Sequence, residues 1–294
     1  MLSRRRFLGC SAALLAACHR PGGAHSGYAW KQLDFDEGPD CPDGEEALVL
    51  VPDGAAALPM VVAFHGRRES IQGLAVGAGA WRDSYQLDRL YERMRAPPLN
   101  DADLKGMSEP TRLAAVNDSL AKTPFGGLVT VCPYSPDVPD RRSPDFAKFS
   151  RFIATQLIPA ARKLTGAPED RDKTGIDGIS MGGRVALLVG LSHPEIFGVV
   201  GALQPAIKPA DAPAISALAK EAMSKAPVRL RLVTSDKDDF LAGIRATSER
   251  MNADGVPHEL LVLRGEHGYE FNRGPGGVEM LFWHERVGRG LPLP

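Results

Sequence analysis

The sequence predicts an α/β fold in which a mostly parallel, doubly wound sheet carries helices on both faces. Short, continuously apolar runs recur along the chain, as is typical of parallel strands buried on both faces. Segments with helical periodicity alternate with these runs, which indicates βαβ units. The composition of the 294 residues, 44% hydrophobic and 24% charged, agrees with one large globular domain.

Six apolar runs and one weaker run are expected to be strands. The six are ALVLVP (47–52), MVVAFHG (60–66), GLVTVCPY (127–134), VVGALQP (199–205), VRLRLVTS (228–235) and HELLVLRG (258–265). The weaker run is TGIDGI (174–179), which is short and only modestly apolar.

Two of the intervening segments have a clear apolar stripe at helical spacing. In residues 146–164 the stripe ends before Gly166, a plausible left-handed cap, and in residues 240–254 it ends before Gly255. The stripes consist of Phe146, Phe149, Ile153, Leu157 and Ala161 in the first, and Leu241, Ile244, Ser248 and Met251 in the second.

A long insertion, residues 67–126, separates the runs 60–66 and 127–134, which are strands 3 and 4 of the predicted fold. It is much longer than an ordinary crossover. We expect a helix over WRDSYQLDRLYERM (81–94) and a loop through PPLNDADLKGMSEP (97–110). Long excursions at the carboxyl edge of a sheet build substrate walls and lids, so Trp81 and Tyr85 are candidates for such a wall or lid.

The N-terminal residues 1–17 have the pattern of an export signal. SRRRFLG resembles a twin-arginine signal, and a short apolar run follows it. LAAC, ending at Cys18, resembles the lipobox of bacterial lipoproteins, in which Cys18 would be lipidated; an ordinary secretory signal is the alternative. We therefore expect an exported, periplasmic or cell-surface protein, anchored to a bacterial membrane through Cys18. Residues 18–27 then form a tether, and residues 28–294 form the domain.

The remaining cysteines, Cys41 and Cys132, permit at most one intramolecular disulfide. Cys132 lies in an apolar run, so it is equally well explained as a buried thiol. The sequence leaves this choice open.

The segment GIDGISMGGR (175–184) places Ser180 within a glycine cluster. A nucleophilic serine in an α/β sheet stands on a sharp strand-to-helix turn, where Gly178 and Gly182 remove side chains that would clash. The amide of Met181, at the start of the next helix, would donate to an oxyanion. A glycine-rich turn with a surface serine is the alternative explanation.

A serine nucleophile needs a base and an acid, and both follow in the order that this fold requires. TSDKDDF follows one predicted strand and GEHGYE follows the next, so both segments lie at the same sheet edge as Ser180. His267 is the expected base. The acid is one of Asp236, Asp238 and Asp239, and the residues alone leave that choice open. The loop FHGRRES (64–70) would supply a second oxyanion donor, the amide of Arg67.

From about Leu48 onward the chain resembles the α/β-hydrolase superfamily, within the esterase group that includes esterase D and feruloyl-esterase-like proteins. The resemblance rests on FHG (64–66), GISMGG (178–183), HPEIFG (193–198), KDDFL (237–241) and GEHGYEF (265–271). It implies an α/β-hydrolase fold and maps the family's acid onto Asp238, with Asp239 as the alternative. The two arginines after FHG and the long insertion depart from the family pattern, and both lie where substrate would bind.

These observations predict a serine hydrolase that cleaves small-molecule carboxylic esters through an acyl-enzyme. A peptidase or amidase could use the same groups, and a non-catalytic ligand-binding lipoprotein could keep the same fold. A metal site made of the aspartates and His267 lacks a recognisable ligand spacing, so no metal or cofactor is expected. The net charge is −1 and basic and acidic residues are well mixed along the sequence, so no basic stripe indicates nucleic-acid binding. The oligomeric state is not indicated.

Overall fold

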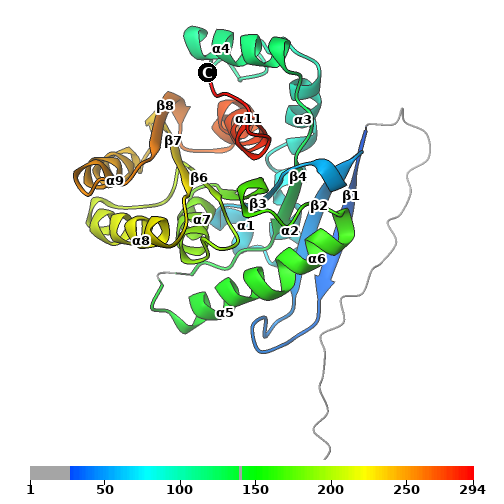
Figure 1. The fold of residues 1–294 in the computed structure, drawn as a ribbon, viewed down its shortest axis with the longest axis vertical. Coiled ribbons are helices and arrows are strands. Elements are labelled where there is room, and N and C mark those ends of the chain that lie inside the picture. The colour runs from blue at the N-terminus through cyan, green and yellow to red at the C-terminus, as the bar shows by residue number, and fades with distance from the viewer. Residues whose placement is uncertain (1–26, 139–140) are drawn as a thin grey trace, which may run out of the picture.

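The computed structural model describes residues 27–138 and 141–294. The predicted export signal, Cys18 and nearly all of the tether lie outside these residues. Figure 1 shows a central twisted sheet with helices on both sides. None of the helices in the described ranges combines the length and apolarity needed to cross a membrane.

Eight strands form one sheet in the order β1-β2-β4-β3-β5-β6-β7-β8. The first two strands pair antiparallel, β2 also pairs antiparallel with β4, and all later neighbours are parallel. The bounds are β1 Tyr28–Phe35, β2 Glu45–Pro52, β3 Met60–Phe64, β4 Val129–Pro133, β5 Thr174–Gly178, β6 Val199–Leu203, β7 Arg229–Lys237 and β8 Glu259–Glu266. The predicted fold class, including the long insertion between the third and fourth strands, is confirmed.

The helices divide between the two faces of the sheet. One face is covered by α5 (Pro144–Phe152), α6 (Ile158–Thr165), α7 (Met181–Ser192), α8 (Ala212–Lys225) and α9 (Leu241–Ala253). The other is covered by α2 (Leu74–Asp83), α3 (Leu87–Arg95), α4 (Pro110–Lys122) and α11 (Gly277–Gly288). Two very short helices, α1 (Arg67–Ser70) and α10 (Tyr269–Phe271), follow β3 and β8.

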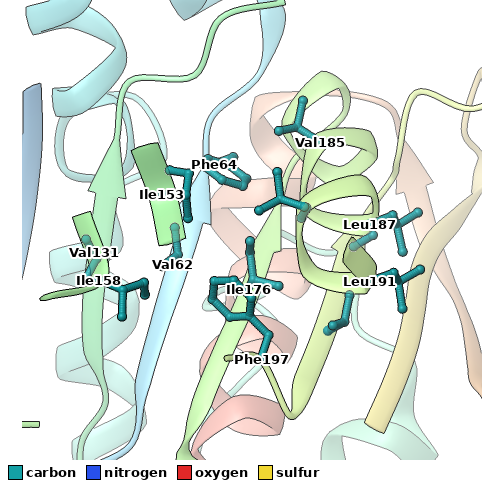
Figure 2. Packing of buried hydrophobic residues seen from close by; sticks show 14 of the residues in the cluster. Val62, Phe64, Val131, Ile153, Ile158, Ile176, Val185, Leu187, Leu191 and Phe197 are labelled. Carbon is teal, nitrogen blue, oxygen red and sulfur yellow. The ribbon is translucent and has the colours of Figure 1, made fainter. Parts of the chain in front are cut away.

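Strand β3 shows how the sequence fills both cores. Val62 and Phe64 pack into the cluster beneath α5–α7, whereas Val61 and Ala63 pack into the opposite cluster. This alternation is the two-residue period of a strand, and every residue is apolar because both faces are covered. Figure 2 shows Val62 and Phe64 beside Ile176 of β5 and the apolar side of α7.

The predicted helix over residues 146–164 is one continuous helical run, in which the π-helical turn η2 (Ile153–Leu157) joins α5 to α6. All five residues of its apolar stripe are buried. The run ends at Gly166 in the left-handed conformation (φ 71°), as the sequence predicted.

The insertion is a structured block packed on the sheet. The predicted helix over residues 81–94 is interrupted, because Gln86 adopts a left-handed backbone (φ 56°) between α2 and α3. The predicted loop over residues 97–110 leads into α4, a helix that was not predicted from the sequence.

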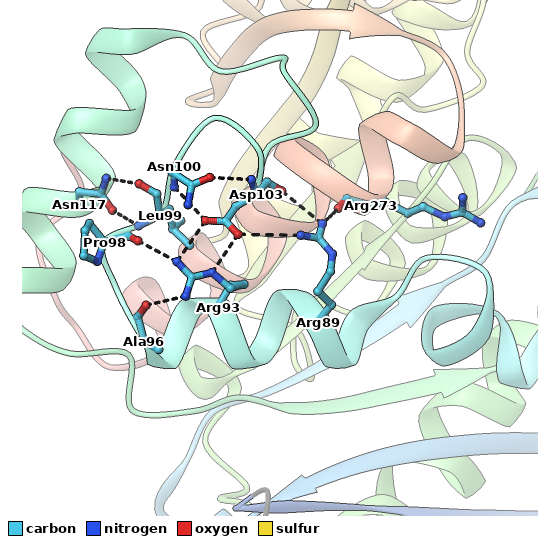
Figure 3. A network of polar contacts seen from close by, with 9 residues as sticks. All are labelled: Arg89, Arg93, Ala96, Pro98, Leu99, Asn100, Asp103, Asn117 and Arg273. Carbon is cyan, nitrogen blue, oxygen red and sulfur yellow. Dashed lines mark hydrogen bonds and ion pairs between the residues drawn. The ribbon is translucent and has the colours of Figure 1, made fainter.

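A buried carboxylate fixes the loop of the insertion. Asp103 accepts hydrogen bonds from Arg93 Nε at 2.8 Å and from the Asn100 amide at 2.9 Å, as Figure 3 shows. Arg89, from the same helix as Arg93, donates to the carbonyl of Arg273 beyond β8. The insertion is thereby bonded both to itself and to the C-terminal part of the chain.

Cys41 and Cys132 are both buried and are not bonded to each other. They belong to the two clusters on opposite faces of the sheet. Burial raises the pKa of the Cys132 thiol well above its ordinary value. Cys132 therefore fills core space as a thiol, which is one of the two alternatives left open by the sequence.

Candidate active site

The turn that carries Ser180 has a backbone conformation rare for a residue with a side chain. Ser180 has φ 57° and ψ −116° and stands between β5 and the first residue of α7. Its amide donates to Leu203 O at 3.0 Å, and its carbonyl accepts from the Ala206 amide at 2.8 Å. Hydrogen bonds to the last residue of β6 and to the chain just after it therefore hold this strained turn in place.

The glycines beside Ser180 are required by close backbone contacts. A Cβ atom on Gly178 would lie 2.5 Å from the carbonyl carbon of Gly182. A Cβ atom on Gly182 would lie 2.4 Å from His65 O. The missing side chain of Gly178 permits the sharp turn. The missing side chain of Gly182 lets the end of β3 approach the start of α7.

His267 lies between Ser180 and Asp238. The Ser180 hydroxyl is 3.0 Å from His267 Nε2, and His267 Nδ1 is 2.8 Å from Asp238 Oδ1. Since an ionised carboxylate only accepts, His267 Nδ1–H donates to it, and Nε2 is left to accept the serine proton. The structure thus brings together three residues that are far apart in the sequence.

Asp238 is oriented by two further donors. The Phe240 amide donates to Oδ1 at 2.9 Å, and the Thr234 hydroxyl donates to Oδ2 at 2.6 Å. The side chain of Asp238 is fully buried, whereas that of His267 is 18% exposed. Asp239 is exposed on the same loop.

The other polar groups near these loops have different partners. Asp236 accepts from the Gly265 amide at 2.9 Å and so holds the loop that leads to His267. Within residues 27–138 and 141–294, no three His, Cys, Asp or Glu side chains are placed to hold a metal ion.

A second serine–histidine pair lies away from this sheet edge. Ser150 Oγ is 2.9 Å from His193 Nε2, and His193 Nδ1 is 2.9 Å from Glu195 Oε1. Ser150 is buried near the end of α5, inside the continuous helical run that η2 and α6 extend. Because the neighbouring amides in a helix interior are used by the helix, no free donor faces this hydroxyl. His193 thus packs α5 against the end of α7.

The two amides predicted to bind an oxyanion belong to the first residues of α1 and α7, Arg67 and Met181. First-turn amides have no acceptor within their own helix. The two helices begin at the ends of neighbouring strands, because β3 pairs with β5 as far as Phe64 and Gly178. The close contact of Gly182 with His65 O keeps these helix starts together.

His65, which precedes this loop, is a buried structural histidine. The Ser135 amide donates to His65 Nε2 at 2.9 Å, and His65 Nδ1 lies 2.8 Å from Gly66 O, to which it must donate. Burial lowers the pKa of His65, although the Gly66 carbonyl and the Glu69 charge oppose the shift. The ring is therefore neutral and ties the loop to the end of β4.

Trp81 and Tyr85, predicted to form a substrate wall or lid, are both buried, at 0% and 2% exposed. Their rings pack edge to face, with centroids 5.1 Å apart. They can influence a substrate only through the residues that they support. The Tyr85 hydroxyl accepts from the Gly66 amide at 3.0 Å, immediately before Arg67.

Comparison with known proteins agrees with this geometry. Residues 134–270, which include Ser180, Asp238 and His267, match the family described as "Putative esterase". This match covers just under half of the chain, and over these residues the chain resembles an esterase family of serine hydrolases. No curated protein sequence matches this chain.

Solved structures share the fold of this chain at low sequence identity. A ferulic acid esterase is 17% identical, with a TM-score of 0.65 over 89% of this chain and 98% of that one. An S-formylglutathione hydrolase from Staphylococcus aureus is 13% identical, with a TM-score of 0.61 over 87% and 98%. A feruloyl esterase module from Clostridium thermocellum is 13% identical, with a TM-score of 0.61 over 95% and 97%.

Proposed function

We propose that this hydrolase cleaves small-molecule carboxylic esters, including aryl and sugar esters, through an acyl-enzyme on Ser180. The observation that carries the proposal is the chain of contacts from Ser180 through His267 to Asp238 on a strained strand-to-helix turn. No other serine–histidine contact described above combines such a turn with neighbouring first-turn amides.

In the proposed reaction Ser180 Oγ attacks the ester carbonyl carbon while its proton moves to His267 Nε2. Asp238 stabilises the imidazolium that forms. The amides of Arg67 and Met181 donate to the carbonyl oxygen as it becomes an oxyanion. His267 then returns the proton to the leaving alkoxide, so that an alcohol departs and the acyl group stays on Ser180.

Water completes the cycle by the same route in reverse. It gives a proton to His267, attacks the acyl carbon, and the second tetrahedral intermediate releases the acid as Ser180 regains its proton. The groups consumed are one ester and one water, and no cofactor takes part in any step.

A fluorophosphonate probe and a chromogenic short-chain ester test this proposal. We expect Ser180 to be labelled and the ester to be hydrolysed, and Ser180→Ala to abolish both. Ser150→Ala is the matched control, since Ser150 also contacts a histidine but should remain dispensable. A folded protein that is neither labelled nor active would favour a binding role. Loss of activity in Ser150→Ala would assign the nucleophile to Ser150 in place of Ser180. Turnover of amides at rates similar to esters would favour the amidase alternative.

We also propose that the protein is exported and anchored to a membrane by lipid on Cys18. Only the residues SRRRFLG and LAAC support this proposal. Processing in cells should be blocked by globomycin, and the acyl mass on the mature terminus should be absent in Cys18→Ser. Recovery of a soluble mature protein that begins after Cys18 would contradict the anchor.

A further inference from the structure

One buried carboxylate, Glu69, connects the loop after β3 with the loop after β8. Glu69 is 1% exposed and lies in α1, two residues after Arg67. Its Oε2 accepts from the Tyr85 hydroxyl at 2.7 Å, and its Oε1 accepts from the Tyr269 hydroxyl. Tyr269 follows His267 by two residues, so each carboxylate oxygen leads to a different segment of the site.

The Tyr85 side of this arrangement closes a small ring around the start of α1. The Gly66 amide donates to the Tyr85 hydroxyl at 3.0 Å, and that hydroxyl donates onward to Glu69. A Cβ on Gly66 would lie 3.2 Å from the Tyr85 hydroxyl and 3.3 Å from Glu69 Oε2. Gly66 therefore gives the two polar groups the space they need directly before the Arg67 amide.

Such support is needed because α1 spans only four residues, Arg67–Ser70. A single turn gains too few hydrogen bonds to be stable on its own. The direction of the Arg67 amide therefore depends on what holds the turn.

The Tyr269 side reaches the histidine. Tyr269 begins the three-residue helix α10, directly after Gly268, and its ring packs against that of Tyr85 with centroids 5.7 Å apart. The guanidinium of Arg68 lies over the Tyr269 ring, 5.4 Å from its centroid. The two short helices that flank the site are thus joined by the carboxylate of Glu69 and by the contact of Arg68 with the Tyr269 ring.

We propose that Glu69 is a positioning residue for the reaction: by accepting from Tyr85 and Tyr269 it sets the Arg67 amide and the His267 loop relative to one another. This inference rests on the proposed function of Ser180. Glu69 does not touch the reacting atoms. It acts through the direction of one amide and through the place of one loop.

The chemistry of each link predicts what its removal does. Tyr85→Phe removes the acceptor of the Gly66 amide, and Tyr269→Phe removes the link to the His267 loop. In Glu69→Gln the amide nitrogen replaces one acceptor oxygen, so only one tyrosine can still donate to the side chain. We expect kcat to fall roughly 10–100-fold in Glu69→Gln, less than the ~10²–10³-fold cost of deleting an oxyanion donor, with KM nearly unchanged.

Tyr91→Phe is the matched control for Tyr85→Phe. Tyr91 is also a buried tyrosine of the insertion, and its hydroxyl accepts from the Leu128 amide at 3.1 Å, away from the site. Both variants lose a buried hydroxyl that accepts from a backbone amide. Only the Tyr85 variant should lose turnover once each protein is compared in its folded state.

The experiment measures kcat, KM and the affinity for an alkyl boronic acid, which forms a tetrahedral adduct with an active serine. Glu69→Gln and Tyr85→Phe should weaken boronate affinity about in proportion to kcat, and their effects should be less than additive in the double variant. The inference is overturned if Glu69→Gln keeps wild-type kcat and boronate affinity, or if Tyr91→Phe loses as much as Tyr85→Phe. An unlabelled Ser180 in the wild type would instead overturn the proposed function itself.

Discussion

Replacing Asp238 by Asn tests how the acid acts on His267. Oδ1 of Asp238 accepts from both His267 and the Phe240 amide, whereas Oδ2 accepts only from Thr234. In Asp238→Asn the side-chain oxygen should keep the Oδ1 position, because an NH2 group there would face the Phe240 amide. The Thr234 hydroxyl can rotate to accept from the new NH2 group. His267 then keeps the tautomer that accepts the serine proton, and only the negative charge is lost.

The magnitude follows from that charge alone. Two unit charges about 4 Å apart interact by about 4 kcal/mol at an effective dielectric constant near 20. Each 1.36 kcal/mol corresponds to about one decade in rate, so the upper bound is about 10³. Because the His267 side chain is partly exposed, we expect kcat to fall by about 10²–10³. A wrong tautomer would cost about 10⁴.

The assay is the pre-steady-state acylation rate with a chromogenic ester, measured for Asp238→Asn and Asp239→Asn. The exposed Asp239 should be replaceable with less than a twofold effect. The reasoning is refuted if Asp239→Asn is the more damaging change, or if Asp238→Asn stays within tenfold of the wild type. A loss beyond about 10⁴ would show that the side chain has flipped and that Phe240 does not control its orientation.

Three further predictions concern the support of the site and of the fold. Gly182→Ala should lower the free energy of unfolding by about 1–3 kcal/mol and should also reduce kcat, because the new Cβ would push the end of β3 away from α7. Urea unfolding and kcat are measured on the same sample, and a wild-type value of either would contradict this prediction. Burial raises the pKa of Glu45 to about 9, so the folded state holds a proton that the unfolded state releases above its ordinary value of 4.5, and stability falls as pH rises from about 4.5 to about 9. Glu45→Gln should remove this loss of stability, which is at most about 1.4 kcal/mol per pH unit. The free energy of unfolding is measured against pH for both proteins, and parallel curves would count against the prediction. Burial raises the pKa of Asp103, but the hydrogen bonds from Arg93 and the Asn100 amide outweigh burial, so the pKa is lowered overall. The carboxylate should therefore stabilise the insertion above pH 4 and lose that effect in stronger acid. Protease cleavage within residues 97–110 should increase in Asp103→Asn at pH 7, and an unchanged cleavage pattern would contradict this.

Strands buried on both faces were readily predicted from the sequence, because most of their residues are apolar. Strand β1 was missed: it lies at the edge of the sheet, and most of its residues are partly or fully exposed, so YAWKQLDF has no continuous apolar run. The same difficulty applies to α4, where only Val116 and Leu120 are buried. The break at Gln86 depends on a single backbone angle that residue type does not specify.

The candidate site was predictable where chain order and strand ends determine position, which is why Ser180, Asp238 and His267 could be named from the sequence. The support around them was not predictable. Glu69 follows two arginines in a short exposed-looking segment, and nothing in its neighbours indicates that two tyrosines from distant segments donate to it. The prediction that Trp81 and Tyr85 form a substrate wall or lid did not take into account how deeply the insertion packs on the sheet.

The sheet order also has a practical consequence. Tyr28 begins the outermost strand, β1, whereas the reactive residues follow β5, β7 and β8 in the other half of the sheet. A resin, fluorophore or carrier joined ahead of Tyr28 would thus attach on the opposite flank of the sheet from Ser180, Asp238 and His267. Immobilisation through that end should keep the support away from these residues, which makes it the natural choice for assays on beads or sensor chips.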